Sequence, residues 1–275
     1  MPRRDDDPEF IEAIARGLDV IKAFGSDRPR MTLADVAAAT GLARPTARRI
    51  LRTLDSLGYV RTHEGAFALT PRVMELGMAY VQSLGLWDVA RPHMERLVAL
   101  TGESTSIAQL DGSDIVYVAR VAVPKIITLR VSIGTRFPAV QTSLGKVLLA
   151  GLPPDQLDAA LAEPSRSGVQ PRWQPQRPEL DAVLCEVRAT GWALTDEQLA
   201  AGIRSVAAPL RDAAGRVIAA MNVTVHAAET SVDTLTGVYL PQLLQAAGEV
   251  SADFARYQAA PVAHVDLTLP SASTG

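Results

Sequence analysis

Arginine is concentrated in one short stretch of this 275-residue chain, and arginine is the residue type best suited to binding a polyanion. Residues 28 to 61 hold seven arginines against two aspartates, a balance of +5, so with a formal net charge of −3 the rest of the chain sums to −8. A basic segment on an acidic protein is typical of nucleic-acid binding, because neutralised phosphates release condensed counterions. A solvated basic face without a partner is the alternative that composition leaves open.

Two helices are expected on the N-terminal side of most of these arginines. Residues 10 to 24 predict the first helix, because apolar residues recur there at steps of three and four. They are Ile11, Ile14, Leu18, Ile21 and Phe24. Thr32 offers an N-cap hydroxyl and Asp35 stands near the capping-box position, which predicts a short second helix through Ala39.

A third helix is predicted over residues 43 to 57, after a turn at Gly41. Pro45 is tolerated in its first turn, and Gly58 ends it. Four residues are expected to face inward: Ile50, Leu51, Leu54 and Leu57. Two short helices joined by a tight glycine-containing turn indicate a helix-turn-helix, whose second helix enters the major groove of DNA.

The segment after the third helix predicts a wing. Residues 59 to 61 and 67 to 69 are expected to form two short strands around the turn HEGA. Nine residues of helices and wing are the predicted DNA contacts: Thr32, Arg44, Pro45, Thr46, Arg48, Arg49, Arg52, Arg61 and His63. The pattern does not separate base contacts from phosphate contacts, and a helical packing module with basic decoration is the alternative.

A second candidate for chemistry is the tetrapeptide SLGK. Ser143 and Lys146 fit the serine-lysine nucleophile pattern SxxK, but the companion triplets SDN and KTG are absent, so we expect no catalysis. Gly145 and Lys146 also fit the end of a phosphate loop, yet Val140 and Val147 replace the required glycine and Ser or Thr. The four histidines have no metal-ligand spacing and Cys185 is the only cysteine, so no metal, cofactor or disulfide is expected.

The length predicts two domains and a connecting segment. We expect a winged helix-turn-helix over residues 9–70, a linker helix over 71–84, a larger domain over 85–258 and a disordered tail over 259–275. The linker carries an apolar stripe that fits core packing or a dimer seam, made of Val73, Leu76, Gly77, Tyr80 and Leu84. The sequence has no apolar run of membrane-spanning length and no signal peptide at its start, so we expect a cytoplasmic protein without membrane contact.

The larger domain is predicted to be α+β, with a mostly antiparallel sheet. Strands are expected at 104–110, 114–121, 126–132, 204–212 and 217–227, and helices at about 88–101, 142–152, 178–191 and 231–257. The helices are expected on one face, which leaves the opposite face free to form a concave site.

In order along the chain, DIVYVARV, GTRFPAVQTSLGKVLLA, GWALTDEQLAAGIRSVAAPLRD and VIAAMNVTVHA resemble the IclR family of bacterial regulators, over about residues 9 to 257. IKAFGSDRPRMTLADVA and GIRSVAAPLRD are most similar to its Pca/Pob branch, which controls the catabolism of protocatechuate, 4-hydroxybenzoate and β-ketoadipate. The resemblance implies a GAF-like effector domain that binds a small carboxylate, and a homodimer or a dimer of dimers.

The resemblance also implies an effector pocket. Its predicted residues are Arg120, Arg130, Ser143, Leu144, Gly145, Thr195, Ser205, Asn222 and Thr224. The backbone N–H groups of residues 143 to 145 suit an anion at a helix start, and residues 222 and 224 share one face of a strand. Thr195, Ser205, Asn222 and Thr224 stand where glyoxylate-sensing members carry an acid, a cysteine and two serines, so that ligand does not transfer.

These observations predict a sequence-specific DNA-binding transcriptional regulator of aromatic acid catabolism, with double-stranded operator DNA and a small organic acid as partners. Activation and repression both remain open. One alternative is an architectural DNA-binding protein without a ligand, and another is a serine-lysine hydrolase that uses Ser143 and Lys146.

Overall fold

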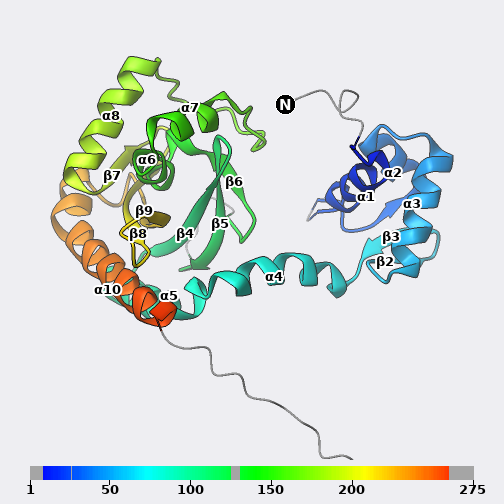
Figure 1. Cartoon of the computed structure of the whole chain (residues 1–275), viewed down its shortest axis with the longest axis horizontal. Coiled ribbons are helices and arrows are strands. Elements are labelled where there is room, and N and C mark those ends of the chain that lie inside the picture. Colours follow the sequence, from blue (N-terminus) through cyan, green and yellow to red (C-terminus); the bar gives the residue numbers. More distant parts are fainter. Residues whose placement is uncertain (1–8, 26, 125–130, 260–275) are drawn as a thin grey trace, which may run out of the picture. The chain divides into compact units, whose positions relative to one another are not determined.

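The computed structural model describes residues 9–25, 27–124 and 131–259, which fall into two compact units divided after Leu84. Each unit has its own hydrophobic core (Figure 1). The predicted tail lies outside the described residues except for Ala259, which is the last residue of a long helix. No helix within the described ranges is long and apolar enough to cross a membrane.

The N-terminal unit is a three-helix bundle with a small antiparallel sheet. Its helices are α1 (Glu12–Ala23), α2 (Leu33–Thr40) and α3 (Arg44–Ser56), and its strands are β1 (Met31–Thr32), β2 (Val60–His63) and β3 (Ala66–Leu69), in the order β1-β3-β2. Val20, Val36 and Leu51, one from each helix, are fully buried in its core. A 3-10 turn (Pro71–Val73) then leads into α4 (Met74–Leu84).

The predicted helix-turn-helix is confirmed, with two departures in its apolar residues. Gly41 and Gly58 adopt φ of +67° and +81°, the left-handed conformation that ends each helix. Leu57 was expected to face inward, and this is wrong: it is 52% exposed, because α3 has ended at Ser56. The residues predicted to form one apolar stripe on the first helix differ in burial: Phe24 is buried, whereas Ile11, Ile14 and Leu18 are exposed.

The C-terminal unit is built on a six-stranded antiparallel sheet in the order β6-β5-β4-β9-β8-β7. Its strands are β4 (Ser104–Asp111), β5 (Asp114–Val121), β6 (Arg136–Pro138), β7 (Ala193–Asp196), β8 (Ile203–Arg211) and β9 (Val217–His226). Its helices are α5 (Leu86–Thr101), α6 (Ser143–Ala150), α7 (Pro154–Ala162), α8 (Arg177–Thr190), α9 (Val232–Thr234), a π-helical turn (Leu235–Tyr239) and α10 (Leu240–Ala259). A 3-10 turn (Ala139–Gln141) precedes α6.

Helices cover both faces of this sheet, so the expectation of a single covered face is wrong. The central residues of β8 and β9 are buried at successive positions, although successive side chains point to opposite faces. Helices α6 and α8 pack on the face that includes Ala207 and Ala220. Helices α5 and α10 contact the sheet on its other side (Figure 1). The concave site must therefore lie under a helix and not on an open face.

The α+β class and four of the five predicted strands are confirmed. The expected strand at 126–132 falls mostly on residues 125–130, which lie outside the described residues. Three helices or strands of the C-terminal unit were not predicted, β6, β7 and α7, and neither was β1 of the N-terminal unit. Strands β6 and β7 have three and four residues, too few for an alternation of apolar and polar residues to be recognised.

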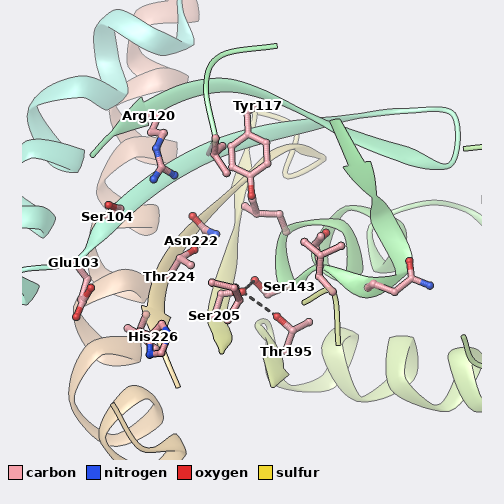
Figure 2. A pocket seen from close by; sticks show the side chains of 17 residues that line it. Glu103, Ser104, Tyr117, Arg120, Ser143, Thr195, Ser205, Asn222, Thr224 and His226 are labelled. Atoms are coloured by element: carbon pink, nitrogen blue, oxygen red, sulfur yellow. Dashed lines mark hydrogen bonds between the residues drawn. The ribbon is translucent and has the colours of Figure 1, made fainter. Parts of the chain in front are cut away.

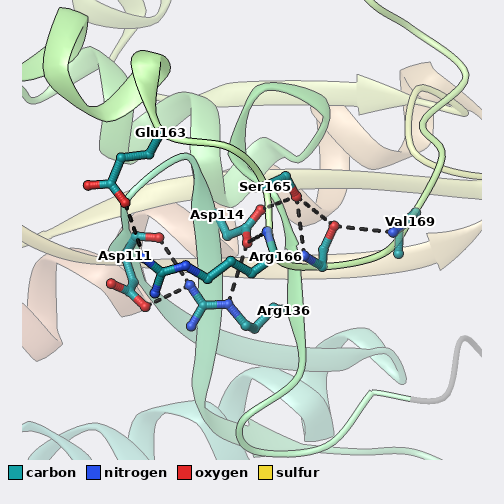
Figure 3. Close-up of polar contacts among 8 residues, drawn as sticks. Asp111, Asp114, Arg136, Glu163, Ser165, Arg166 and Val169 are labelled. Atoms are coloured by element: carbon teal, nitrogen blue, oxygen red, sulfur yellow. Dashed lines mark hydrogen bonds and ion pairs between the residues drawn. The ribbon is translucent and has the colours of Figure 1, made fainter. Parts of the chain in front are cut away.

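A buried carboxylate fastens the loop that follows α7. Asp114 is 1% exposed, and it accepts hydrogen bonds from the Ser165 hydroxyl at 2.6 Å and the Arg166 backbone N–H at 2.7 Å (Figure 3). Arg136 lies 3.4 Å from the same carboxylate and 2.6 Å from that of Asp111. These contacts join the β5–β6 edge of the sheet to the segment that leads towards α8.

Candidate nucleic-acid interface and ligand pocket

Helix α3 presents one basic face to solvent. Its inner side is anchored by three buried residues, Ala47, Leu51 and Leu54. Arg44, Arg48 and Arg52 are exposed and follow each other at four-residue steps, which places them along one side of the helix. Arg49 is exposed beside them. Within the described ranges none of these four guanidinium groups forms an ion pair, so all four are free to meet phosphates or base edges.

The remaining predicted DNA contacts lie at the edges of this face. Pro45 is exposed and Thr46 is half-buried in the first turn of α3. The Thr32 hydroxyl accepts from the Asp35 backbone N–H at 3.3 Å, and the Thr32 backbone N–H donates to the Asp35 carboxylate at 2.9 Å, which completes the capping box of α2. The Thr32 hydroxyl also donates to the same carboxylate at 2.8 Å. The backbone N–H and hydroxyl of Thr32 lower the pKa of Asp35. Thr32 is therefore committed to its own helix.

The predicted wing is the hairpin of β2 and β3. Its tip is the pair Glu64 and Gly65, with φ of +52° and +77°, as a two-residue turn of type I′ requires. Arg61 and His63 are exposed on β2, and His63 Nδ1 lies 3.5 Å from the Glu64 carboxylate. Glu64 is unusual in this position, because a left-handed conformation disfavours residues other than glycine, asparagine and aspartate.

The second site is a pocket under α6, and the pairing of residues between neighbouring strands brings its side chains together. Ser104, Thr224, Ser205 and Thr195 are paired in turn across four strands, β4, β9, β8 and β7, and form one polar row. One step away, Arg120, Ser106 and Asn222 form a second row across β5, β4 and β9. Both rows lie on the same sheet face, because Thr224 is two residues from Asn222 and Ser104 is two residues from Ser106.

Hydrogen bonds tie these rows to α6 and to one another (Figure 2). The Ser205 hydroxyl lies 2.7 Å from the Ser143 hydroxyl and 2.9 Å from that of Thr195. Asn222 accepts from the Ser106 backbone N–H at 3.1 Å through Oδ1, and its Nδ2 donates to the Thr224 hydroxyl at 2.9 Å. The pocket therefore offers an ordered set of neutral donors and acceptors.

The start of α6 supplies backbone donors. Thr142 is its N-cap, and its hydroxyl accepts from the Gly145 N–H at 3.0 Å. No acceptor for the N–H groups of Ser143 and Leu144 is found among the described residues, as expected for the first two residues of a helix. A ligand anion at this helix start would meet those two donors.

Gly145 has a packing role and does not line the pocket. A Cβ at this position would lie 2.1 Å from the Ala139 carbonyl oxygen, so only glycine allows α6 to approach the preceding turn. Its N–H is already bound by Thr142, which removes the third backbone donor that the sequence predicted.

Seven of the nine predicted pocket residues line this one pocket: Arg120, Ser143, Leu144, Thr195, Ser205, Asn222 and Thr224. Gly145 does not, and Arg130 lies outside the described residues. Ten further lining residues were not predicted: Glu103, Ser104, Tyr117, Val131, Gln141, Thr142, Leu199, Ile203, Val225 and His226. Ser104 of β4 and His226 of β9 follow from the two-residue alternation once strand pairing is known, whereas no local signal indicates the others.

Arg120 is the cation of the pocket. Its guanidinium donates to the Ser106 hydroxyl at 3.0 Å, and no carboxylate of the described residues forms an ion pair with it. Burial lowers the pKa of Arg120, and the nearby Tyr117 acts in the opposite direction. A half-buried arginine without a carboxylate partner favours an anionic ligand.

The side chain of Lys146 points away from Ser143. Its Nζ donates to Gln198 Oε1 at 2.6 Å and to the Leu194 carbonyl at 3.3 Å, and it lies 4.7 Å from the centre of the Trp173 ring. Burial lowers the pKa of Lys146 to about 8. Since the Ser143 hydroxyl is bonded to Ser205, this geometry gives no support to the serine-lysine alternative.

Comparisons with known proteins identify both units. Residues 13–64 match the model of the IclR helix-turn-helix domain, and residues 78–252 match that of the bacterial transcriptional regulator IclR C-terminal domain. The Pca regulon regulatory protein of Pseudomonas putida is 37% identical, over 89% of this chain and 84% of that protein. The p-hydroxybenzoate hydroxylase transcriptional activator of Acinetobacter baylyi is 34% identical, over 88% and 91%.

Two solved structures share the whole architecture. A putative transcriptional regulator from a Rhodococcus species is 48% identical, with a TM-score of 0.79 over 90% of this chain and 100% of that one. An IclR homolog from Microbacterium hydrocarbonoxydans, complexed with 4-hydroxybenzoate, is 26% identical, with a TM-score of 0.77 over 89% and 99%. The helix-turn-helix with a free arginine face, the pocket under α6 and these matches together show that the chain belongs to the IclR family of bacterial transcriptional regulators.

Proposed function

We propose that this protein controls genes of aromatic acid catabolism and that a small organic acid, of the protocatechuate, 4-hydroxybenzoate or β-ketoadipate type, regulates its binding to operator DNA. The names of the two relatives and the 4-hydroxybenzoate complex of a structural neighbour support this substrate class. The observation that carries the proposal is the pocket itself. It combines two backbone N–H groups at a helix start, buried hydroxyls and an arginine, and neither the N–H groups nor the arginine has an acceptor or a carboxylate partner, respectively, among the residues that the structure describes.

In this proposal the carboxylate of the acid binds at the start of α6, where the N–H groups of Ser143 and Leu144 and the neighbouring hydroxyls converge. Arg120, Asn222 and Thr224 lie along the remainder of the acid. The described lining also includes five apolar side chains, Val131, Leu144, Leu199, Ile203 and Val225, beside polar ones such as Glu103, Gln141 and His226. A pocket that combines apolar side chains with placed polar groups is typical of a site for a small amphiphilic ligand.

We also propose that the protein acts as a homodimer or a dimer of dimers. Two groups of exposed apolar residues support it: Phe10, Ile11, Ile14 and Leu18 before and in α1, and Met74, Leu76, Met78 and Tyr80 on α4. Large exposed apolar patches are uncommon on monomers and mark interaction surfaces. Light scattering after size exclusion should give at least twice the 29.3 kDa of one chain, and Ile14→Asp with Leu18→Asp should lower that mass.

Calorimetric titration with protocatechuate, 4-hydroxybenzoate and β-ketoadipate tests the ligand. We expect one of them to bind and to shift the affinity for an operator selected from a random duplex pool, because a ligand that prefers one state displaces the equilibrium. A protein that binds DNA without a ligand predicts no heat with any acid and little sequence selection. In that case the regulatory proposal fails.

A further inference from the structure

Tyr117 lines the pocket at a position that regular alternation along β5 does not predict. Ala108 pairs with Tyr117 and Ile107 pairs with Ala119, so Val118 is an extra residue on β5, a β-bulge. Without the bulge, Tyr117 and Arg120 would point to opposite faces, since they are three residues apart. With it, they pair with Ala108 and Ser106, which are two residues apart, and both side chains enter the pocket.

The Tyr117 hydroxyl forms no hydrogen bond with the part of the chain that the structure describes. The side chain is 7% exposed, and its ring packs edge-on against Phe137 with 5.8 Å between ring centres. Its hydroxyl points into the pocket (Figure 2), and no hydrogen bond to it is found among the described residues. Burial raises the pKa of Tyr117 to about 12, so the hydroxyl keeps its proton at neutral pH and can donate it. A hydroxyl that opens into a pocket can donate to a ligand or to water.

Tyr117 and Arg120 lie on a strand that is distant in the sheet from the strand that Ser143 contacts. Ser143 contacts Ser205 on β8, whereas Tyr117 and Arg120 are on β5, and β4 and β9 lie between those two strands. Adjacent strands are about 4.8 Å apart, which separates the two backbones by about 14 Å. An acid whose carboxylate is bound at α6 therefore directs its far end towards β5.

We propose that Tyr117 and Arg120 bind a second polar group at the far end of the effector, a phenolic hydroxyl or a second carboxylate, and so determine which acids the pocket accepts. This inference rests on the proposed function. Both kinds of group offer an oxygen that accepts from the tyrosine hydroxyl and from the guanidinium. An acid without such a group forms neither of these hydrogen bonds, and a site built to bind a polar group of the substrate rejects an analogue that lacks it.

Two matched pairs of acids test the proposal by calorimetry: 4-hydroxybenzoate against benzoate, and adipate against hexanoate. The wild-type protein should bind the first member of at least one pair at least tenfold more tightly than the second, and that pair identifies the second group. Tyr117→Phe should reduce the ratio at least fivefold, mainly by weakening the acid with two polar ends. Tyr239→Phe, on the π-helical turn outside the pocket, should leave the ratio unchanged.

Arg120→Gln is a second variant and should reduce the same ratio. An unchanged ratio in Tyr117→Phe and Arg120→Gln, both folded by their thermal transitions, overturns the inference while the proposed function stands. An equal loss for both members of a pair also overturns it, because Tyr117 would then hold the carboxylate common to both. If no acid binds the wild-type protein, the proposed function fails as well.

Discussion

Replacing Arg48 and Arg49 together with alanine should weaken operator binding and reduce its dependence on salt. Both side chains are exposed on α3 and have no ion pair within the described ranges, so their loss should change the free energy of unfolding by no more than about 0.5 kcal/mol. Each phosphate contact contributes about 0.9 to the slope of log K against log salt. Two lost contacts should therefore flatten the slope by about 1.8 per chain, or about 3.6 when two chains bind one operator.

Fluorescence anisotropy with a labelled operator at several salt concentrations between roughly 50 and 200 mM measures this slope. The matched control is Arg16→Ala with Arg91→Ala, which removes the same charge from α1 and α5. If one of the two arginines binds a guanine base and not a phosphate, the slope changes less. The double variant then no longer discriminates against a substitution at that base pair, which usually costs about 1 to 3 kcal/mol of binding free energy. A double variant with wild-type affinity and slope would refute the assignment of this face to DNA.

Four substitutions test the folding side of the structure by urea denaturation. Gly145→Ala should destabilise the protein by about 1 to 3 kcal/mol, the reverse of a usual glycine-to-alanine change in a helix, because its Cβ would overlap the Ala139 carbonyl. Asp114→Asn should cost about 2 to 3 kcal/mol and expose the loop after α7 to protease, since a buried carboxylate with three partners is lost. Glu64→Asn should stabilise the wing by up to about 1 kcal/mol, because asparagine tolerates the left-handed conformation of this turn. The pKa of Lys146 in the folded protein, about 8, lies below its value in the unfolded chain, so the buried charge destabilises the fold fully below pH 8. The free energy of unfolding of the wild-type protein should therefore rise between about pH 8 and pH 10, by up to about 3 kcal/mol. Lys146→Met should lack that rise.

Local patterns were sufficient for the N-terminal unit because its signals act over a few residues. The Thr32 cap, the Gly41 turn and the spacing of apolar residues in 43–57 each depend on neighbours within one or two helical turns. The arginine face followed from the same spacing. Leu57 was misplaced because the end of a helix is decided by cap geometry, which shifts by a residue or two without changing the pattern.

The pocket was predicted only in part, since its residues come from distant strands. Motif resemblance indicated Ser143, Thr195, Ser205 and Asn222, and the structure brings these together. It did not indicate Tyr117, whose sequence neighbours read as an ordinary buried strand.

What the chain's own sequence determined is its class: a basic helix-turn-helix, an α+β domain and a short helix that begins with free backbone donors. These depend on periodicity, glycine and proline placement, and capping, all of which are local. The pairing of β4 with β9 was decided by the folded sheet, because it joins residues more than a hundred positions apart and leaves no trace in local spacing. The bulge at Val118 lies in the pair of the consecutive strands β4 and β5, and the apolar pattern of β5 does not show where the register shifts. One extra residue in β5 is enough to put Tyr117 beside Arg120, and only the tertiary structure shows it.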